Sequence, residues 1–144
     1  MEKRVKVIVD TDVLIKAYRG NEDKIRNLGL LKDYYCISVI TAMELISGAK
    51  NIKQLASLNK VLKVYDVLNI DERISKKALQ LYKTYILKHS LGLSDCFIAS
   101  TALHYNLQLY TDNKKDYAFI EGMEFYKEKW HNLSSLALQQ PDKK

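Results

Sequence analysis

The stretch VIVDTDVLIKAY at residues 7–18 decides the fold, because it joins a buried strand directly to a helix. Val5–Val9 is a short, almost uninterrupted apolar run, which suits a parallel strand buried on both faces better than a helix. Thr11 or Asp12 can then cap a helix that continues to the end of the quoted stretch. The strand therefore ends on a carboxylate, Asp10, at the point where a helix begins.

Apolar strands and amphipathic helices keep alternating along the rest of the chain. Further strands are predicted at Tyr35–Ile40, Val67–Ile70, Leu107–Thr111 and Met123–Tyr126. Further helices are predicted at Asn21–Leu31, Ala42–Ala49 with Thr41 as cap, Asn51–Val64, from Asp71 onward, and Asp95–Tyr105 with Ser94 as cap and Asn106 as stop. This alternation implies an α/β fold, a three-layer α/β/α sandwich with a four- to five-stranded parallel sheet. We expect one domain at residues 1–130 and a partly disordered tail at 131–144.

The composition is typical of a cytoplasmic globular protein with a polyanion among its possible partners. The 144 residues suffice for one domain. We expect no signal peptide, and no run approaches the ~18 consecutive apolar residues of a membrane span. Cys36 and Cys96 lie in apolar stretches without metal-ligand spacing, so we expect buried free thiols in a reducing compartment. The net charge of +6 favours a nucleic acid partner without establishing one.

Carboxylates fall where the predicted strands end. Asp10 ends the first strand, and Glu44 lies one helical turn past the second. Asp112 and Asp116 follow the fourth strand, and Asp95 stands at the start of a helix. Ligands of open parallel sheets bind beyond the carboxyl ends of the strands. Four segments of the chain are therefore expected to deliver carboxylates to one edge of the sheet.

Such a cluster predicts a bound divalent cation. Two carboxylates about 5 Å apart repel each other by roughly 3 kcal/mol at an effective dielectric constant of 20. A hard cation with oxygen ligands offsets this repulsion, and Mg²⁺ or Mn²⁺ suits a few carboxylates plus waters. The three histidines stand too far apart in the sequence to suggest zinc. Taken singly, each acid could instead be a helix cap, an alternative that Asp12 and Asp71 fit.

Four segments, taken in order, resemble the PIN-domain ribonucleases, and within them the VapC-type toxins of toxin–antitoxin pairs. The matching segments are VIVDTDVLIKAY (7–18), SVITAMELISGA (38–49), LSDCFIASTALHYNLQLYT (93–111) and DNKKDYAFIEGMEFY (112–126). Each segment alone is a weak signal, whereas the four in this order are a strong one. The resemblance runs from the first strand to Tyr126.

The resemblance implies a metal site and a set of catalytic residues. Asp10, Glu44 and Asp95 would form the acidic triad around Mg²⁺ or Mn²⁺. Asp116 matches the fourth acidic position, where it would position or deprotonate the attacking water, although Asp112 leaves that assignment open.

The resemblance also implies supporting residues and shows two departures from the family. Asn113 would support the fourth acidic position. Thr11 could contact a phosphate or a ligand carboxylate, or simply cap a helix. Asp12 stands where family members often have Asn or Ser, and Tyr117 replaces the usual Phe. The basic side chains that could attract RNA are Lys50, Lys53, Lys76 and Lys77.

The function implied is that of a metal-dependent endoribonuclease acting as a toxin. Its partners would be RNA, a cognate antitoxin that covers the acidic groove, and a second copy of the chain docked through the first two helices. An RNA-maturation nuclease and a non-catalytic PIN-fold binding module remain alternatives. A haloacid-dehalogenase-type phosphatase is disfavoured because Val-Leu-Ile rather than Gly-Thr follows Asp12. A receiver domain is disfavoured because Asp71 is a poor match to its phosphoacceptor position.

Overall fold

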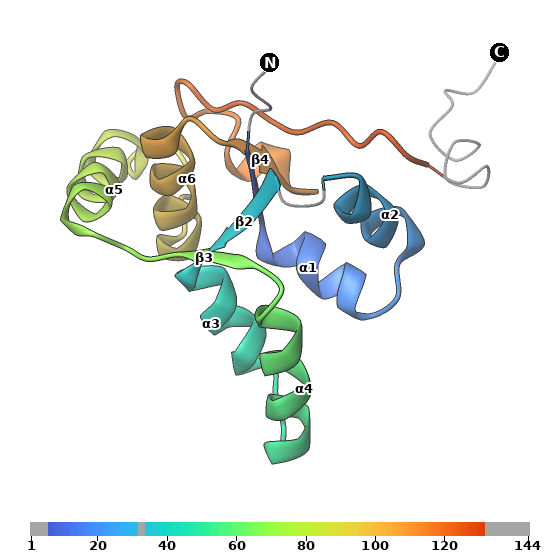
Figure 1. The fold of residues 1–144 in the computed structure, drawn as a ribbon. Coiled ribbons are helices and arrows are strands. Elements are labelled where there is room, and N and C mark those ends of the chain that lie inside the picture. Colours follow the sequence, from blue (N-terminus) through green and yellow to red (C-terminus); the bar gives the residue numbers. More distant parts are fainter. Residues whose placement is uncertain (1–5, 32–33, 132–144) are drawn as a thin grey trace, which may run out of the picture.

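Four short parallel strands form the centre of the molecule (Figure 1). The computed structural model describes residues 6–31 and 34–131. The strands, in the spatial order β3-β2-β1-β4, are β1 (Val7–Val9), β2 (Tyr35–Ser38), β3 (Asp66–Leu68) and β4 (Gln108–Tyr110). Every pairing is parallel, which confirms the predicted type of sheet.

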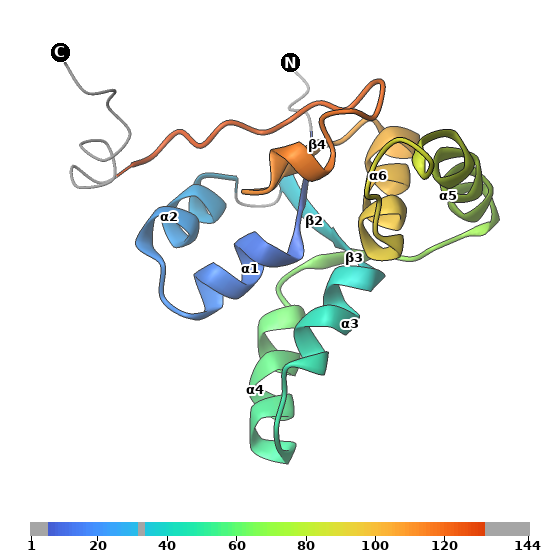
Figure 2. The same cartoon turned by 180° about the vertical axis from the view of Figure 1, so that it is seen from behind.

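Helices cover both faces of this sheet, as Figures 1 and 2 show from opposite sides. They are α1 (Thr11–Tyr18), α2 (Glu22–Leu31), α3 (Val39–Ser47), α4 (Ile52–Leu62), α5 (Glu72–Tyr85) and α6 (Leu93–Tyr105). Side chains alternate along β1, so Ile8 packs in the core with α5 and α6, whereas Val7 and Val9 pack in the core with α1 to α4. The result is the predicted three-layer sandwich.

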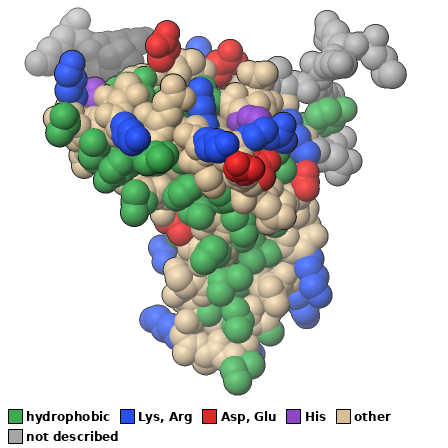
Figure 3. Space-filling model, turned by 90° about the vertical axis from the view of Figure 1, so that its left-hand side faces the viewer, with side chains coloured by type: hydrophobic (Ala, Val, Ile, Leu, Met, Phe, Trp, Pro, Cys, Tyr) green, Lys and Arg blue, Asp and Glu red, His purple; other side chains and the backbone are tan. Residues whose placement is uncertain are grey.

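Helices α3 and α4 form an arm that extends away from the carboxyl edge of the sheet (Figures 1 and 2). Hydrophobic side chains gather on the outer face of the molecule, from the α5 side down along this arm (Figure 3). The exposed large apolar residues of α3, α4, α5 and the start of α6 include Met43, Ile52, Leu79 and Leu93. A surface of this kind suits contact with another polypeptide.

Three helix starts differ from the sequence predictions. Asp10, rather than Thr11 or Asp12, caps α1, because its side chain accepts the backbone N–H of Thr11. Helix α3 begins at Val39, where the Ser38 hydroxyl accepts a backbone N–H, so Thr41 lies buried inside the helix instead of capping it.

The third difference concerns α6, which begins before the predicted position. Gly92 takes the cap position with no side-chain hydrogen bond, and Ser94 lies inside the first turn. The other end of this helix confirms the prediction, because Asn106 stops it in the left-handed conformation at φ 54°. Asp71 caps α5 as predicted.

The fifth strand predicted at Met123–Tyr126 is reduced to one isolated parallel bridge between Leu109 and Phe125. The predicted tail lies outside the described residues except for His131. Both cysteines are buried free thiols, as predicted. Within the described ranges, no helix combines the length and apolar character that crossing a bilayer requires.

Candidate active site

Asp10 is fixed at the carboxyl end of β1 by three hydrogen bonds. Its Oδ1 accepts the backbone N–H of Thr11 at 2.8 Å. Its Oδ2 accepts the hydroxyls of Thr111 at 2.9 Å and Tyr117 at 3.0 Å. Only 6% of the residue is exposed. These bonds hold one defined carboxylate at the point where the sheet meets α1.

Asp95 reaches the same place from the first turn of α6. Its Oδ1 lies 2.9 Å from the Tyr117 hydroxyl, so that this one hydroxyl, which has a single proton to donate, lies within hydrogen-bond distance of both Asp10 and Asp95. Tyr117 is fully buried at the end of the short 3-10 helix η2 (Lys114–Asp116). Burial and the two neighbouring carboxylates raise the pKa of the Tyr117 phenol, so it remains protonated and can donate.

Glu44 is joined to this group through Thr11. The Thr11 hydroxyl donates to Glu44 Oε1 at 2.8 Å and lies 3.1 Å from the Thr41 hydroxyl. Thr11 therefore contacts a carboxylate, which is one of the two roles predicted for it. The contact ties the end of β1 to α3.

Burial and mutual repulsion shape the electrostatics of the cluster. Burial, followed by the charge of Asp12, raises the pKa of Asp10 to about 6. Burial also raises the pKa of Asp95, and the nearby charges of Asp116, Glu44 and Asp12 add to this effect. The structure thus brings four of the predicted acids together, and Asp12 lies close by as a fifth. The four are Asp10, Glu44, Asp95 and Asp116.

The raised pKa of Asp10 is expected to make the metal-free protein less stable as the pH rises. Between the ordinary pKa of 3.8 and about 6, the folded state holds a proton that the unfolded chain has lost. Unfolding then releases a proton, so the free energy of unfolding falls through this range, by at most about 3 kcal/mol.

The variant Asp10→Asn removes this pH dependence. In denaturant unfolding with EDTA, we expect it to exceed the wild type in stability at about pH 7.5 and to match it near pH 4. A stability difference that is the same at both pH values would contradict this account of Asp10.

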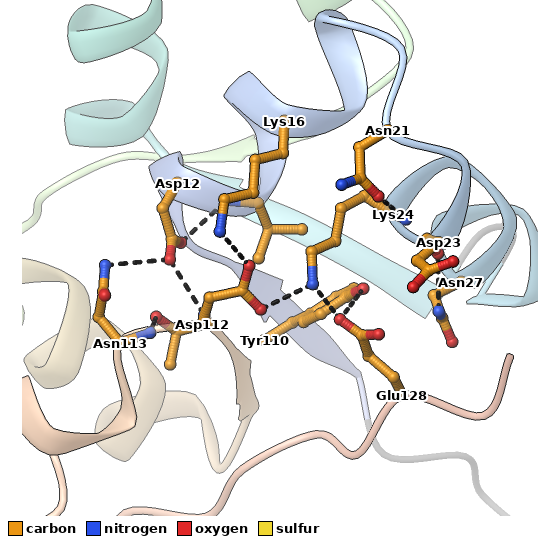
Figure 4. Close-up of polar contacts among 12 residues, drawn as sticks. Asp12, Lys16, Asn21, Asp23, Lys24, Asn27, Tyr110, Asp112, Asn113 and Glu128 are labelled. Carbon is orange, nitrogen blue, oxygen red and sulfur yellow. Dashed lines mark hydrogen bonds and ion pairs between the residues drawn. The ribbon is translucent and has the colours of Figure 1, made fainter. Parts of the chain in front are cut away.

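Asp112 is already neutralised by two lysines (Figure 4). Lys16 Nζ lies 2.5 Å and Lys24 Nζ 2.7 Å from its carboxylate. Burial alone would raise the pKa of Asp112, but these two ammonium groups hold it below its ordinary value. The charge of Asp116 contributes to the raised pKa of Asp95, so Asp116 is the better candidate for the fourth acidic position.

Asp12 orders the loop after β4. Its Oδ2 accepts the backbone N–H of Asp112 at 3.0 Å and the Asn113 side-chain amide at 3.1 Å, while its Oδ1 accepts the N–H of Val13. Asn113 therefore supports the site through Asp12 (Figure 4). Asp12 was expected as a possible cap, but Asp10 takes that position, and the role of Asp12 is instead this contact across the chain.

A buried lysine joins the same loop to the C-terminal segment. Lys24, only 7% exposed, pairs with both Asp112 and Glu128 (Figure 4). Burial lowers the pKa of this ammonium, but the two carboxylates outweigh that effect and raise it above its ordinary value. The Tyr110 hydroxyl also donates to Glu128, at 3.1 Å.

Asn27, which is fully buried, fixes the backbone of the same segment to α2. Its Nδ2 donates to the carbonyls of Asp23 at 2.7 Å and Trp130 at 2.8 Å. Its Oδ1 accepts the backbone N–H groups of Lys129 at 2.8 Å and Trp130 at 3.1 Å. One side chain thus serves as the hydrogen-bonding partner that a neighbouring strand would provide.

One other group of possible metal ligands lies beside this segment. Asp23, Glu128 and His131 are the only three such residues in the described ranges with ligand atoms all within 4.8 Å of one another. Lys24 already supplies a positive charge to Glu128. The carboxylates at the sheet edge are more widely spaced, with the Tyr117 hydroxyl between two of them.

Of the four lysines predicted to attract RNA, Lys50 shares a groove with one of the carboxylates. It lines a groove of about 260 Å³ together with Glu44 and Arg19. Lys76 pairs with Glu72 on the surface of α5. No contact in the described part of the chain brings Lys53, Lys76 or Lys77 to the acidic cluster.

Tyr117 and Thr111 are the site residues that sequence reasoning missed. Both hydroxyls lie within hydrogen-bond distance of Asp10 Oδ2, and both residues are buried. The available signal was the tyrosine itself, because a hydroxyl at a position that usually holds a phenyl ring needs a hydrogen-bond partner when buried.

Comparison with known proteins identifies the family. The PIN domain family model matches residues 7–120. Ribonuclease VapC1 of Methanocaldococcus jannaschii is 35% identical over 127 residues, which cover 84% of this chain and 87% of that protein. The chain is a PIN domain protein of the VapC type. The resemblance inferred from the four sequence segments is thereby confirmed.

Solved structures of related PIN domain proteins share the fold. A DNA-bound VapBC from Salmonella typhimurium superposes with a TM-score of 0.77 at 27% identity, covering 85% of this chain and 98% of that one. A toxin–antitoxin complex from Klebsiella pneumoniae gives a TM-score of 0.71 at 31% identity, with 82% and 95% covered. The PIN domain sandwich is therefore present over most of the chain.

Proposed function

We propose that this protein is a divalent-metal-dependent endoribonuclease and the toxin of a toxin–antitoxin pair. The observation that carries the proposal is the convergence of Asp10, Glu44, Asp95 and Asp116 at the carboxyl edge of the sheet. The ribonuclease name of the relative from Methanocaldococcus jannaschii supports RNA as the substrate.

The chemistry of the donor set fits a hard divalent cation. Every side chain proposed to bind the metal is a carboxylate, and oxygen-only ligand sets suit Mg²⁺ or Mn²⁺. Burial and the nearby charge of Asp12 raise the pKa of Asp10, a buried acid that forms no ion pair among the described residues. Asp10, Glu44 and Asp95 would hold the ion.

The bound cation would offset charge on the phosphate and make a water molecule a better nucleophile. Asp116, half-buried and close enough for its charge to act on Asp95, would orient that water and accept its proton. Lys50 and Arg19 line the groove beside Glu44 and would attract the RNA backbone by charge. Tyr117 and Thr111 keep Asp10 in place during these steps.

Removal of the metal is expected to abolish RNA cleavage by the wild-type protein. Cleavage of a fluorescently labelled single-stranded RNA should stop in excess EDTA and return when Mg²⁺ or Mn²⁺ is supplied above the chelator. A mock purification from cells without the gene controls for contaminating ribonucleases. Cleavage that continues in EDTA above the mock level would contradict the proposed chemistry.

The toxin role rests on the relatives and on the exposed surface. The structures from Klebsiella pneumoniae and Salmonella typhimurium are a toxin–antitoxin complex and a VapBC. The exposed apolar side chains along α3, α4 and α5 offer area for an antitoxin or for a second copy of this chain (Figure 3).

The protein encoded by an adjacent reading frame would distinguish a toxin from an RNA-maturation nuclease. If this protein is a toxin, the neighbouring gene encodes a small protein that co-purifies with it and suppresses RNA cleavage. A neighbouring protein that neither binds nor inhibits would favour a maturation nuclease.

A further inference from the structure

We propose that Tyr117 is a positioning residue that sets the relative placement of the Asp10 and Asp95 carboxylates for cation binding. This inference rests on the proposed metal-dependent function and deepens it. The geometry points to the role because the Tyr117 hydroxyl lies 3.0 Å from Asp10 Oδ2 and 2.9 Å from Asp95 Oδ1.

The tyrosine is rigidly held. Its side chain has no exposed surface, and it belongs to the core cluster formed with α5 and α6. Helix η2 ends immediately before it, so its backbone is fixed as well. A buried ring in a close-packed core presents its hydroxyl at a constant position.

The Tyr117 hydroxyl contributes more to the orientation of the Asp95 carboxylate than to that of Asp10. Asp10 is also fixed by Thr11 and Thr111. Within the described part of the chain, the Asp95 carboxylate has the Tyr117 hydroxyl as its only hydrogen-bond partner. Without the hydroxyl, the half-exposed Asp95 carboxylate could rotate, whereas Asp10 would stay in place.

The hydrogen bonds also determine which oxygens remain available. Tyr117 engages Oδ2 of Asp10 and Oδ1 of Asp95. The other oxygen of Asp95 accepts no hydrogen bond from the described residues, and Oδ1 of Asp10 accepts only one. Both can therefore donate lone pairs to a cation while their partner oxygens are held in place.

Tyr117→Phe tests this role with little disturbance to packing, because phenylalanine keeps the ring. Tyr126→Phe is the matched control, since Tyr126 is also a buried tyrosine, 5% exposed, and its hydroxyl has no hydrogen-bond partner among the described residues. Loss of a group that orients a metal ligand typically weakens metal affinity about 10- to 100-fold.

Calorimetric titration with Mn²⁺ should give about tenfold weaker binding for Tyr117→Phe and wild-type binding for Tyr126→Phe. RNA cleavage by Tyr117→Phe should fall at limiting Mn²⁺ and recover at saturating Mn²⁺. Equal Mn²⁺ affinity in both variants and the wild type would overturn the inference. A cleavage defect that persists at saturating Mn²⁺ with unchanged affinity would overturn it too.

The wild-type protein separates failure of this inference from failure of the proposed function. If the wild type neither binds Mn²⁺ nor cleaves RNA, both fall; if it does both and Tyr117→Phe matches it, only the positioning role falls. A second readout needs no variant: in ¹³C-tyrosine-labelled protein, Mg²⁺ should shift the Cζ resonance of Tyr117 and leave that of Tyr126 in place. An unmoved Tyr117 resonance under Mg²⁺ saturation would overturn the inference.

Discussion

Replacement of Asp95 by asparagine is expected to reduce RNA cleavage by on the order of a thousandfold or more. The change removes one negative charge from the carboxylate cluster and one proposed ligand of the cation. The amide oxygen of the new side chain can still accept the Tyr117 hydroxyl, so the local structure should survive. The measurement is the initial rate of cleavage of one defined RNA at saturating Mn²⁺.

Asp66→Asn is the matched control for this experiment. Asp66 begins β3 at the amino end of the sheet, with its side chain 56% exposed and paired with Lys6. It has the same chemistry as Asp95 at the opposite edge of the sheet, so its replacement should leave the rate unchanged. Equal rates for the wild type and Asp95→Asn would remove Asp95 from the mechanism.

Replacement of the buried Lys24 by methionine is expected to destabilise the protein by about 3 to 5 kcal/mol. Methionine retains most of the apolar side-chain volume but leaves Asp112 and Glu128 without the ammonium group between them. A carboxylate buried without its partner costs far more than the intact pair contributes. Denaturant unfolding near neutral pH measures the difference.

Lys16→Met is the control, because Lys16 is the other cation paired with Asp112 but its side chain is 47% exposed. An exposed pair contributes below about 1 kcal/mol, so Lys16→Met should be nearly neutral. If the free energy of unfolding falls by the same amount in both variants, the burial of Lys24 does not explain the loss of stability in Lys24→Met.

The sheet and its acidic edge could be predicted because both depend on local patterns. β1 and its terminal Asp10 follow from an apolar run that stops at a carboxylate. The Asp71 cap and the Asn106 stop are equally local. Asp95 lies in the first turn of the helix that precedes β4, and such a helix starts at the carboxyl edge of a parallel sheet, so the meeting of Asp10 with Asp95 was predictable as well.

The choice between neighbouring hydroxyls could not be predicted. Ser38 and Thr41 are both good helix caps, and the sequence does not say where the backbone leaves the extended conformation. In the structure, Thr41 is fully buried within α3 beside Thr11, which leaves the cap to Ser38. Tertiary packing, rather than local preference, decides this helix start.

The lysine network and the Tyr117 contact escaped prediction for a different reason. Lys24 meets Asp112 and Glu128 across 88 and 104 positions of the chain. No periodicity or motif relates residues so far apart, and each of the three alone resembles an ordinary surface charge. Only the folded arrangement shows that Lys24 is buried between them.

The hydrogen bonds of Asn27 restrict which amino acids can occupy positions 129 and 130. At Lys129 and Trp130 this amide bonds only to main-chain groups, so these hydrogen bonds do not depend on the side chains of the two residues. Most substitutions at these two positions should therefore leave the hydrogen bonds of Asn27 intact, although replacing Trp130 removes the ring that faces Arg26 of α2. Proline is the exception, because it lacks the N–H that Asn27 accepts from each position.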